Sequence, residues 1–170
     1  EKCQNSVRCN FVFQHANSNL MDVGLTDLLD NSGIDPTIAG VSLVKGLMSF
    51  EELQHYKMII SLEGNDVSSG LKWQLLSKSV VIMSPPTLTS WAMEELLEPW
   101  VHYVPMHHNG SNAEDMVQWV LDHDEQAQKI SERATLFMED MVYHPDAAGD
   151  EKLIKENIIK RYTALWTSGK

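Results

Sequence analysis

The sequence predicts an α/β fold in which a Rossmann-like layer of parallel strands is followed by helices. Two runs, residues 56–62 and 79–83, are almost wholly apolar, as strands buried on both faces are. Only 16 residues separate these runs, and so short a helical connection between two buried strands implies a parallel pair. Over the last 60 residues the apolar positions repeat with a helical period instead. We therefore treat residues 1–170 as one domain, with residues 111–170 as its helical C-terminal part.

The segments before the first apolar run are shorter and less regular. Residues 10–15 are rich in Phe and Val and predict a strand, and residues 20–23 predict a shorter extended piece. Residues 30–46 contain Gly, Pro and Asn and predict a long loop. Ser49 and Glu52 have the spacing of a capping box, which predicts a short helix.

Beyond residue 62, the chain alternates between helices and strands before it becomes helical. A polar turn leads into a helix from about Ser68 to Ser77, and after the strand at 79–83 a helix is expected over residues 89–97. A short strand is expected at residues 101–104. Apolar stripes predict three further helices, over residues 113–121, 127–141 and 153–166. Four tryptophans are expected in the core: Trp91, Trp100, Trp119 and Trp166.

Composition narrows the class of protein. The 170 residues are 43% hydrophobic, with ordinary Gly and Pro content, so disordered and collagen-like chains are excluded. Thirteen basic and 24 acidic residues give a net charge of −11, which argues against a nucleic-acid partner. The first residue is Glu1 rather than Met, so we expect a piece of a longer chain. Cys3 and Cys9 are spaced to allow a disulfide loop, and two free thiols are the alternative.

The most informative segment for chemistry is residues 63–73, which follow a buried strand and open a helix. Ligands of open α/β sheets bind beyond the carboxyl ends of the strands. Gly64 allows a turn that a Cβ would not tolerate, and the candidate helix caps are Asp66, Ser68 and Ser69. A helix N-terminus favours a phosphate, to which Lys72 would add a mobile cation. The alternative is an ordinary capped helix whose polar residues only shape the turn.

This segment also resembles a known family. Residues 56–73, YKMIISLEGNDVSSGLKW, resemble the core of the glycosyltransferase family 90 proteins. That family includes fungal capsule-associated xylosyltransferases, protein O-glucosyltransferases of the endoplasmic reticulum and bacterial lipopolysaccharide-modifying enzymes; the Gly-Asn-Asp form of residues 64–66 is similar to the last group. The resemblance spans about residues 20–138 and continues through residues 22–26, 79–81, 90–94, 97–105 and 124–127.

The resemblance implies the C-terminal, donor-binding half of a two-domain GT-B glycosyltransferase. Such an enzyme transfers a sugar, with inversion, from a UDP-sugar to a hydroxyl of a protein or glycan acceptor. UDP-glucose and UDP-xylose are the expected donors, and no metal is expected. The family's catalytic aspartate belongs to the N-terminal acceptor domain, so no catalytic residue is named in this chain. The donor-binding residues implied by position are Arg8, just before the expected first strand, Gly64, Asn65, Asp66, Ser68, Ser69, Gly70, Lys72 and Glu94.

Two departures from the family pattern bear on donor binding. The animal glucosyltransferases carry an arginine where this chain has Gly70, and many relatives have a glutamate where it has Thr89. The diphosphate must then be met by Lys72, Arg8 or backbone N–H groups, and Glu94 is left as the weaker candidate for a sugar hydroxyl. These departures keep an alternative open, a non-catalytic nucleotide-binding or packing module of the same fold.

The remaining expectations concern metals and location. His102, His107 and His108 lie within seven residues, but two of them are adjacent and would point apart on a strand, so we expect no metal site. For a eukaryotic chain the resemblance implies the lumen of the endoplasmic reticulum or Golgi, with any membrane anchor upstream. A bacterial chain would be cytoplasmic or membrane-associated. Asn109-Gly110-Ser111 is a glycosylation sequon in an expected surface turn.

Overall fold

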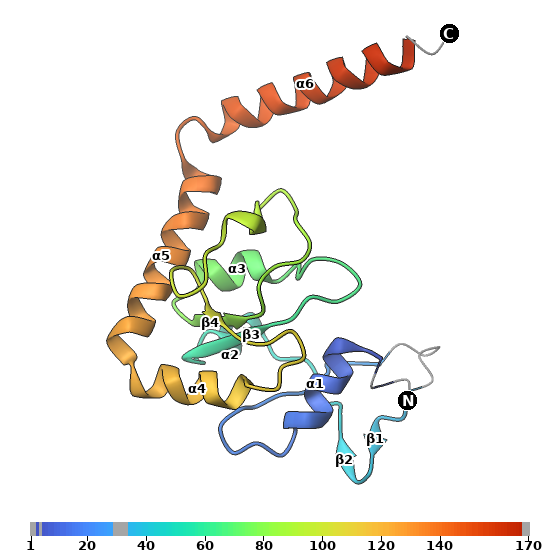
Figure 1. Cartoon of the computed structure of the whole chain (residues 1–170), viewed down its shortest axis with the longest axis vertical. Helices are drawn as coiled ribbons and strands as arrows, with labels where there is room; N and C mark the ends of the chain where they lie inside the picture. Colours follow the sequence, from blue (N-terminus) through green and yellow to red (C-terminus); the bar gives the residue numbers. More distant parts are fainter. Residues whose placement is uncertain (1–2, 4, 29–33, 168–170) are drawn as a thin grey trace.

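The computed structural model describes residue 3 and residues 5–28 and 34–167, and its centre is a three-stranded parallel sheet (Figure 1). The strand order is β3-β4-β5, with β3 at Met58–Ser61, β4 at Val80–Met83 and β5 at Val104–Pro105. Strands β3 and β4 pair in parallel register from Met58↔Val80 to Ser61↔Met83. The predicted parallel pair is therefore confirmed, and the α/β architecture is consistent with a Rossmann-like fold.

Strand β4 is the centre of the core because both of its faces are covered. All four of its residues are buried. Val80 and Ile82 pack into a cluster with α4 (Ala113–Asp122), whereas Val81 and Met83 pack into a second cluster with α3 (Leu71–Leu76). Helix α5 (Asp124–Tyr143) contributes to both clusters. The continuous apolar run at residues 79–83 thus reflects a strand between two layers of helices.

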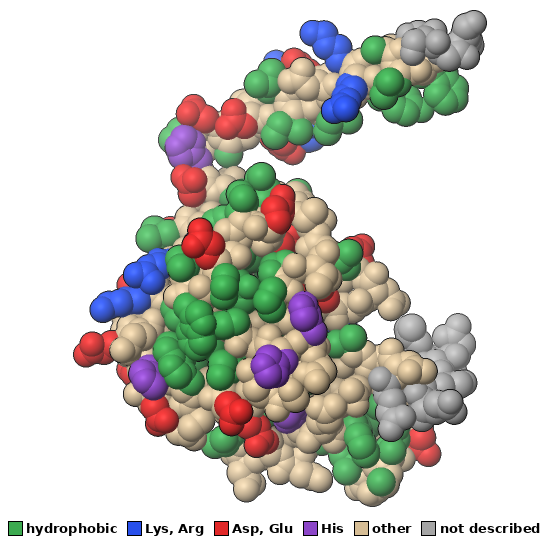
Figure 2. Space-filling view, in the orientation of Figure 1, with side chains coloured by type: hydrophobic (Ala, Val, Ile, Leu, Met, Phe, Trp, Pro, Cys, Tyr) green, Lys and Arg blue, Asp and Glu red, His purple; other side chains and the backbone are tan. Residues whose placement is uncertain are grey.

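The C-terminal helix extends away from this body. Helix α6 (Ala147–Thr167) projects from the end of α5 (Figure 1), and its residues 148–166 are exposed. Large apolar side chains stand out along it (Figure 2); those more than half exposed are Leu153, Ile154, Ile158, Ile159, Tyr162, Leu165 and Trp166. The three predicted C-terminal helices are confirmed. Within the described ranges, no helix has the length and apolarity needed to cross a membrane.

The expected strand at residues 10–15 is wrong, because this segment is part of helix α1 (Val7–His15). Ser6 caps the helix by accepting a hydrogen bond from the Cys9 backbone N–H. Cys9 and Val12 form a buried cluster with Leu43, and Cys9 is joined to Cys3 in a disulfide. Burial on the helix therefore outweighs the strand propensity of the Phe and Val side chains. Cys3 and Cys9 therefore form the disulfide that their spacing allows, rather than two free thiols.

The next segments differ from the sequence expectation in detail. Residues 20–23 form no strand. Residues 30–33 lie outside the described residues, and the rest of the expected loop contains a hairpin of β1 (Thr37–Ile38) and β2 (Val41–Ser42). Ala39 and Gly40, with φ of 50° and 80°, make its two-residue turn, as primed hairpin turns require. The capping box at Ser49 is confirmed and opens α2 (Phe50–Leu53).

Two expected helices are shorter than predicted. Helix α3 covers Leu71–Leu76 rather than 68–77, and residues 89–97 contain only the 3₁₀ turn η1 (Glu94–Leu96). The segment before η1 cannot continue as a helix because Met93 is in the left-handed region, with φ of 51°. The strand expected at residues 101–104 forms at Val104–Pro105 instead, as β5. The core placement of the tryptophans is wrong for Trp91, Trp100 and Trp166, which are 65%, 43% and 66% exposed.

Candidate functional site

The candidate site lies at the carboxyl end of the sheet, where β3 runs into the Gly64 turn. Ser61, the last residue of β3, donates a hydrogen bond from its buried hydroxyl to the hydroxyl of Ser68 at 3.0 Å. Between these serines the chain turns tightly, with the Gly64 N–H donating to the Asp66 carbonyl at 3.1 Å. Asn65, Asp66 and Ser69 are exposed on this turn. The predicted loop therefore stands where ligands of open α/β sheets bind.

Arg8 reaches this turn from helix α1, 54 residues away in sequence. One guanidinium Nη donates to the Leu62 carbonyl at 3.1 Å. A Cβ placed on Gly64 would lie 3.3 Å from the guanidinium carbon of Arg8, so the absence of a side chain there lets the guanidinium lie against the turn. Arg8 is exposed and, within the described part of the chain, has no carboxylate partner. Arg8 was expected just before a strand and instead lies on helix α1. Its side chain still contacts the predicted loop.

The cap of helix α3 differs from the expectation. The N-cap is Gly70, with no side-chain hydrogen bond, whereas the Asp66 carboxylate accepts from the Val67 N–H at 2.8 Å and so shapes the turn. Ser68 is engaged with Ser61 rather than with the first turn of the helix. A six-residue helix without a side-chain cap is a weaker phosphate site than the longer helix predicted from the sequence.

Lys72 is not a mobile cation. Its ammonium lies 2.7 Å from a carboxylate oxygen of Glu94, and the two side chains are 14% and 3% exposed. Glu94 also accepts from the Ser90 backbone N–H at 2.6 Å and from the Ser90 hydroxyl at 2.7 Å. The pairing joins α3 to η1 across 22 residues, and it neutralises the one cation of residues 63–73. A donor contact by Lys72 or Glu94 stays a prediction.

The charge state of Glu94 follows from its surroundings. Burial alone would raise the pKa of its carboxyl, but the hydrogen bonds from Lys72 and Ser90 outweigh that effect and hold the pKa at about 2. The Glu94 carboxylate is therefore ionised at neutral pH and balances the charge of Lys72. A buried pair of this kind is costly to break on one side only.

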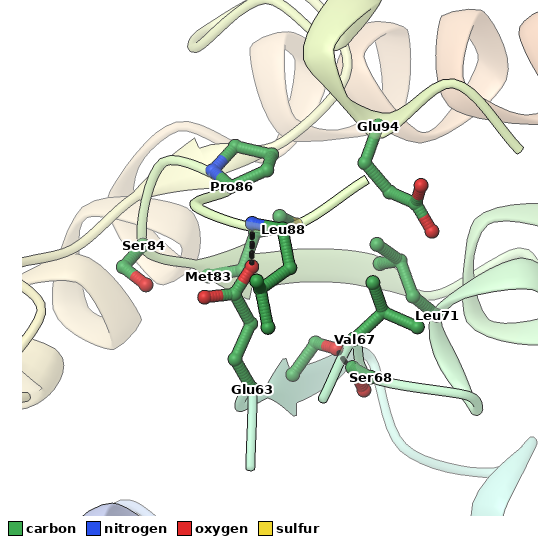
Figure 3. Close-up of a pocket in the computed structure, with 10 residues that line it drawn as sticks. Glu63, Val67, Ser68, Leu71, Met83, Ser84, Pro86, Leu88 and Glu94 are labelled. Atoms are coloured by element: carbon green, nitrogen blue, oxygen red, sulfur yellow. Dashed lines mark hydrogen bonds between the residues drawn. The ribbon is translucent and has the colours of Figure 1, made fainter. Parts of the chain in front are cut away.

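Glu63 adds a second carboxylate that the sequence analysis did not assign. One of its oxygens accepts from the Thr87 N–H at 2.9 Å and from the Leu88 N–H at 3.2 Å, and the other accepts from the Thr87 hydroxyl. Figure 3 shows Glu63 and Leu88 joined on one side of a small pocket, with Glu94 on the other. The pocket has a cavity volume of only about 10 Å³, which is room for about one water molecule. It is lined also by Ser61, Val67, Ser68, Leu71, Met83, Ser84 and Pro86.

The structure therefore brings most of the predicted site residues together. Arg8 and Gly64 meet directly, Ser68 lines the pocket, and Lys72 and Glu94 form a pair at its side. Gly70 does not line the pocket, and a Cβ added there would meet the Trp73 indole nitrogen at 3.1 Å. Asn65, Asp66 and Ser69 stay on the exposed turn without a side-chain contact to the pocket.

The histidines do not form a cluster with metal-binding geometry. His102 accepts from the Glu98 N–H at 2.9 Å and packs on the Phe137 ring, and burial lowers the pKa of its imidazole. His107 and His108 lie in an exposed loop. Within the described residues, no three His, Cys, Asp or Glu side chains are close enough to hold a metal ion.

These features define a Rossmann-like α/β domain with a polar site at the edge where such folds bind ligands. The model of Glycosyl transferase family 90 matches residues 4–147. The chain therefore belongs to glycosyltransferase family 90, as the sequence resemblance indicated.

Relatives with assigned names agree with this membership. The chain is 35% identical over 91 residues to O-glucosyltransferase LpsA of Dichelobacter nodosus, a match that covers 54% of this chain and 29% of the relative. It is 32% identical over 120 residues to Protein O-glucosyltransferase 2 of Danio rerio, covering 68% of this chain and 22% of the relative. Protein O-glucosyltransferase 3 of Homo sapiens is 28% identical over 127 residues, covering 74% and 24%. The chain thus spans less than a third of the length of these relatives.

Proposed function

We propose that this chain is the donor-binding half of a glycosyltransferase that transfers a sugar from a UDP-sugar to a hydroxyl of a protein or glycan acceptor. Membership in family 90 and the O-glucosyltransferase names of the relatives support sugar transfer. UDP-glucose and UDP-xylose are the donors we favour. The catalytic base and the acceptor contacts would come from an N-terminal acceptor domain, so the residues of this chain bind and orient the donor.

The observation that carries this proposal is the place of Arg8. A chain with a net charge of −11 repels a diphosphate at long range, so a local cation is needed to hold one. Lys72 is already neutralised by Glu94. Arg8 instead presents an exposed guanidinium at the end of β3, against the Gly64 turn. A planar guanidinium is well suited to a phosphate, which it binds through two parallel hydrogen bonds.

The polar groups of the pocket after β3 support a role in orienting the donor. The hydroxyls of Ser61 and Ser68 border the pocket, and hydroxyl groups form hydrogen bonds with sugar and ribose hydroxyls. The chemistry then depends on positioning of the donor and on stabilisation of the UDP leaving group.

The experiment is calorimetry of the full-length protein with UDP, ADP and GDP. We expect UDP to bind more tightly than the other two, and Arg8→Gln to weaken UDP binding about ten- to 150-fold, the value of one charge-assisted hydrogen bond of roughly 1.5–3 kcal/mol. Arg133→Gln removes the same charge from the exposed face of α5 and serves as the matched control, with affinity within twofold of wild type. Equal binding of all three nucleotides, or none by folded protein, contradicts the proposal.

One observation favours the alternative of a non-catalytic module. Lys72 is neutralised by Glu94, and Gly70 stands where the animal glucosyltransferases carry an arginine. This chain therefore has fewer cations near the loop to bind a diphosphate. A module of this kind would bind nucleotide, or pack against another domain, without transferring sugar. Donor binding without acceptor-dependent release of UDP would identify it.

We also propose a location for the protein. A eukaryotic chain of this kind would lie in the lumen of the endoplasmic reticulum or Golgi, and a bacterial one in the cytoplasm or at a membrane. The Cys3–Cys9 disulfide supports an oxidising compartment. The exposed Asn109 turn, which carries the sequon, is compatible with lumenal glycosylation.

A further inference from the structure

The segment between β4 and η1, residues 84–93, crosses the carboxyl end of the sheet without regular structure. Its backbone donors are met by glutamate side chains: Thr87 and Leu88 donate to Glu63, and Ser90 donates to Glu94. An irregular segment depends on such partners because its peptide groups have no ladder to join. Three carboxylates therefore hold this segment, which we call the crossing loop: Glu63 at Thr87 and Leu88, Glu95 at the Thr89 hydroxyl, and Glu94 at Ser90.

The carboxylates differ in their positions in the sequence: Glu94 and Glu95 directly follow the loop, whereas Glu63 lies far before it. Glu94 belongs to η1 and so secures the end of the crossing loop next to it in sequence. Glu63 follows β3 and holds the loop from 24 residues away. It is thus the carboxylate that ties the loop to the segment after β3, and Figure 3 shows its hydrogen bond with Leu88.

The crossing loop forms one wall of the pocket after β3. Pro86 and Leu88 line the pocket opposite Ser68 and Leu71, so a shift of the loop changes the shape and size of the space. Glu63 is also next in sequence to Leu62, whose carbonyl holds Arg8, and to Gly64, on which Arg8 lies. The same short segment after β3 therefore sets both the cation and the wall of the site.

We propose that Glu63 is a positioning residue of the donor site, which acts by accepting hydrogen bonds from the crossing loop rather than through its charge. This inference rests on the proposed donor-binding function. Its geometry makes it testable, because both N–H donors meet the same carboxylate oxygen and the Thr87 hydroxyl meets the other. In Glu63→Gln the amide oxygen can accept from both N–H groups, and the amide NH₂ can donate to the Thr87 oxygen.

The test compares Glu63→Gln with Glu63→Met in the full-length protein. Met keeps the length of the side chain but accepts no comparable hydrogen bond. We expect Glu63→Gln to have a donor KM within twofold of wild type, and Glu63→Met to raise the donor KM about tenfold or more, with the acceptor KM and kcat changed less than threefold. Glu98→Met is the matched control, because the exposed Glu98 carboxylate accepts no hydrogen bond within the described residues.

Hydrogen exchange of the Thr87 and Leu88 amides, measured without ligand, is the second readout. Wild type and Glu63→Gln should protect these amides, and Glu63→Met should speed their exchange about tenfold. If Glu63→Met does not fold, a comparison of Thr87→Val with Thr87→Ser tests the same contact from the loop side. We expect the donor KM to rise in Thr87→Val, which lacks the hydroxyl, and not in Thr87→Ser. Equal impairment by Gln and Met, or an unaltered Glu63→Met protein, overturns the inference. A wild type that binds no donor refutes the proposed function, and the exchange data still decide whether Glu63 holds the loop.

Discussion

Replacement of Lys72 by Met tests the buried ion pair beside the candidate site. From the sequence alone, Lys72 is a mobile surface cation, and its loss should leave stability unchanged. The structure predicts otherwise, because the change would leave Glu94, which is 2% exposed, without its cation, although Ser90 would still donate two hydrogen bonds to the carboxylate. Removing one partner of a buried pair costs about 3–5 kcal/mol. The partial exposure of Lys72 places the expected cost near 3 kcal/mol, or about 6–12 °C in the melting temperature of a domain of this size.

The assay is denaturant unfolding of the full-length protein, followed through the transition of this domain. Lys72→Met combined with Glu94→Gln should recover most of the loss and lie within about 1 kcal/mol of wild type, because the glutamine amide can still pair with both groups of Ser90. Lys155→Met is the matched control. It removes a lysine from an exposed ion pair with Glu151 on α6 and should cost less than about 0.5 kcal/mol. A Lys72→Met protein as stable as wild type would refute the reasoning.

Two further predictions concern stability. The pKa of the Glu94 carboxyl is about 2 in the folded protein, against an ordinary value of 4.5. Between pH 2 and pH 4.5 the unfolded chain therefore binds more protons than the folded chain. The contribution of this group, about 3 kcal/mol, is therefore complete above about pH 4.5 and is lost as the pH falls toward 2; unfolding measured against pH should show this loss in wild type and not in the Lys72→Met/Glu94→Gln protein. Joint replacement of Cys3 and Cys9 by Ser opens the small loop that the disulfide closes over a sequence separation of 6 and should lower the unfolding free energy by about 2 kcal/mol. An unchanged denaturation midpoint would show that the disulfide does not stabilise the first turn of α1.

The parts of the fold that could be predicted are those in which local pattern and tertiary burial agree. The run at residues 79–83 is apolar because β4 is covered on both faces, and the stripes beyond residue 113 match helices α4 and α5, each with one buried side. Helix α1 could not be predicted in this way. Its Phe and Val side chains favour a strand, whereas the disulfide and the contacts of Cys9 and Val12 with Leu43 favour a helix. Because Leu43 is distant in sequence from Cys9 and Val12, no local pattern shows these contacts.

The same distinction applies to the candidate site. The loop at residues 63–73 was found from a buried strand followed by a Gly-containing turn, and its place at the carboxyl end of the sheet followed from the parallel strand pair. The pairing of Lys72 with Glu94 depends on how residues 84–97 cross α3, which no local pattern shows. Glu63 was missed as a contact for the same reason. The one available signal is its position directly after β3, at the sheet edge where ligands of such folds bind.

Sugar transfer by the full-length protein tests the central claim most directly. Release of UDP from UDP-glucose and UDP-xylose is measured with and without a hydroxyl-bearing acceptor, next to ADP-glucose and GDP-glucose as controls, and residues 1–170 are measured alone in parallel. We expect acceptor-dependent release of UDP and formation of the glycosylated product by the full-length protein, and no transfer by the isolated chain. A folded full-length protein that binds UDP but transfers no sugar to any acceptor, or transfer by residues 1–170 alone, would contradict this expectation.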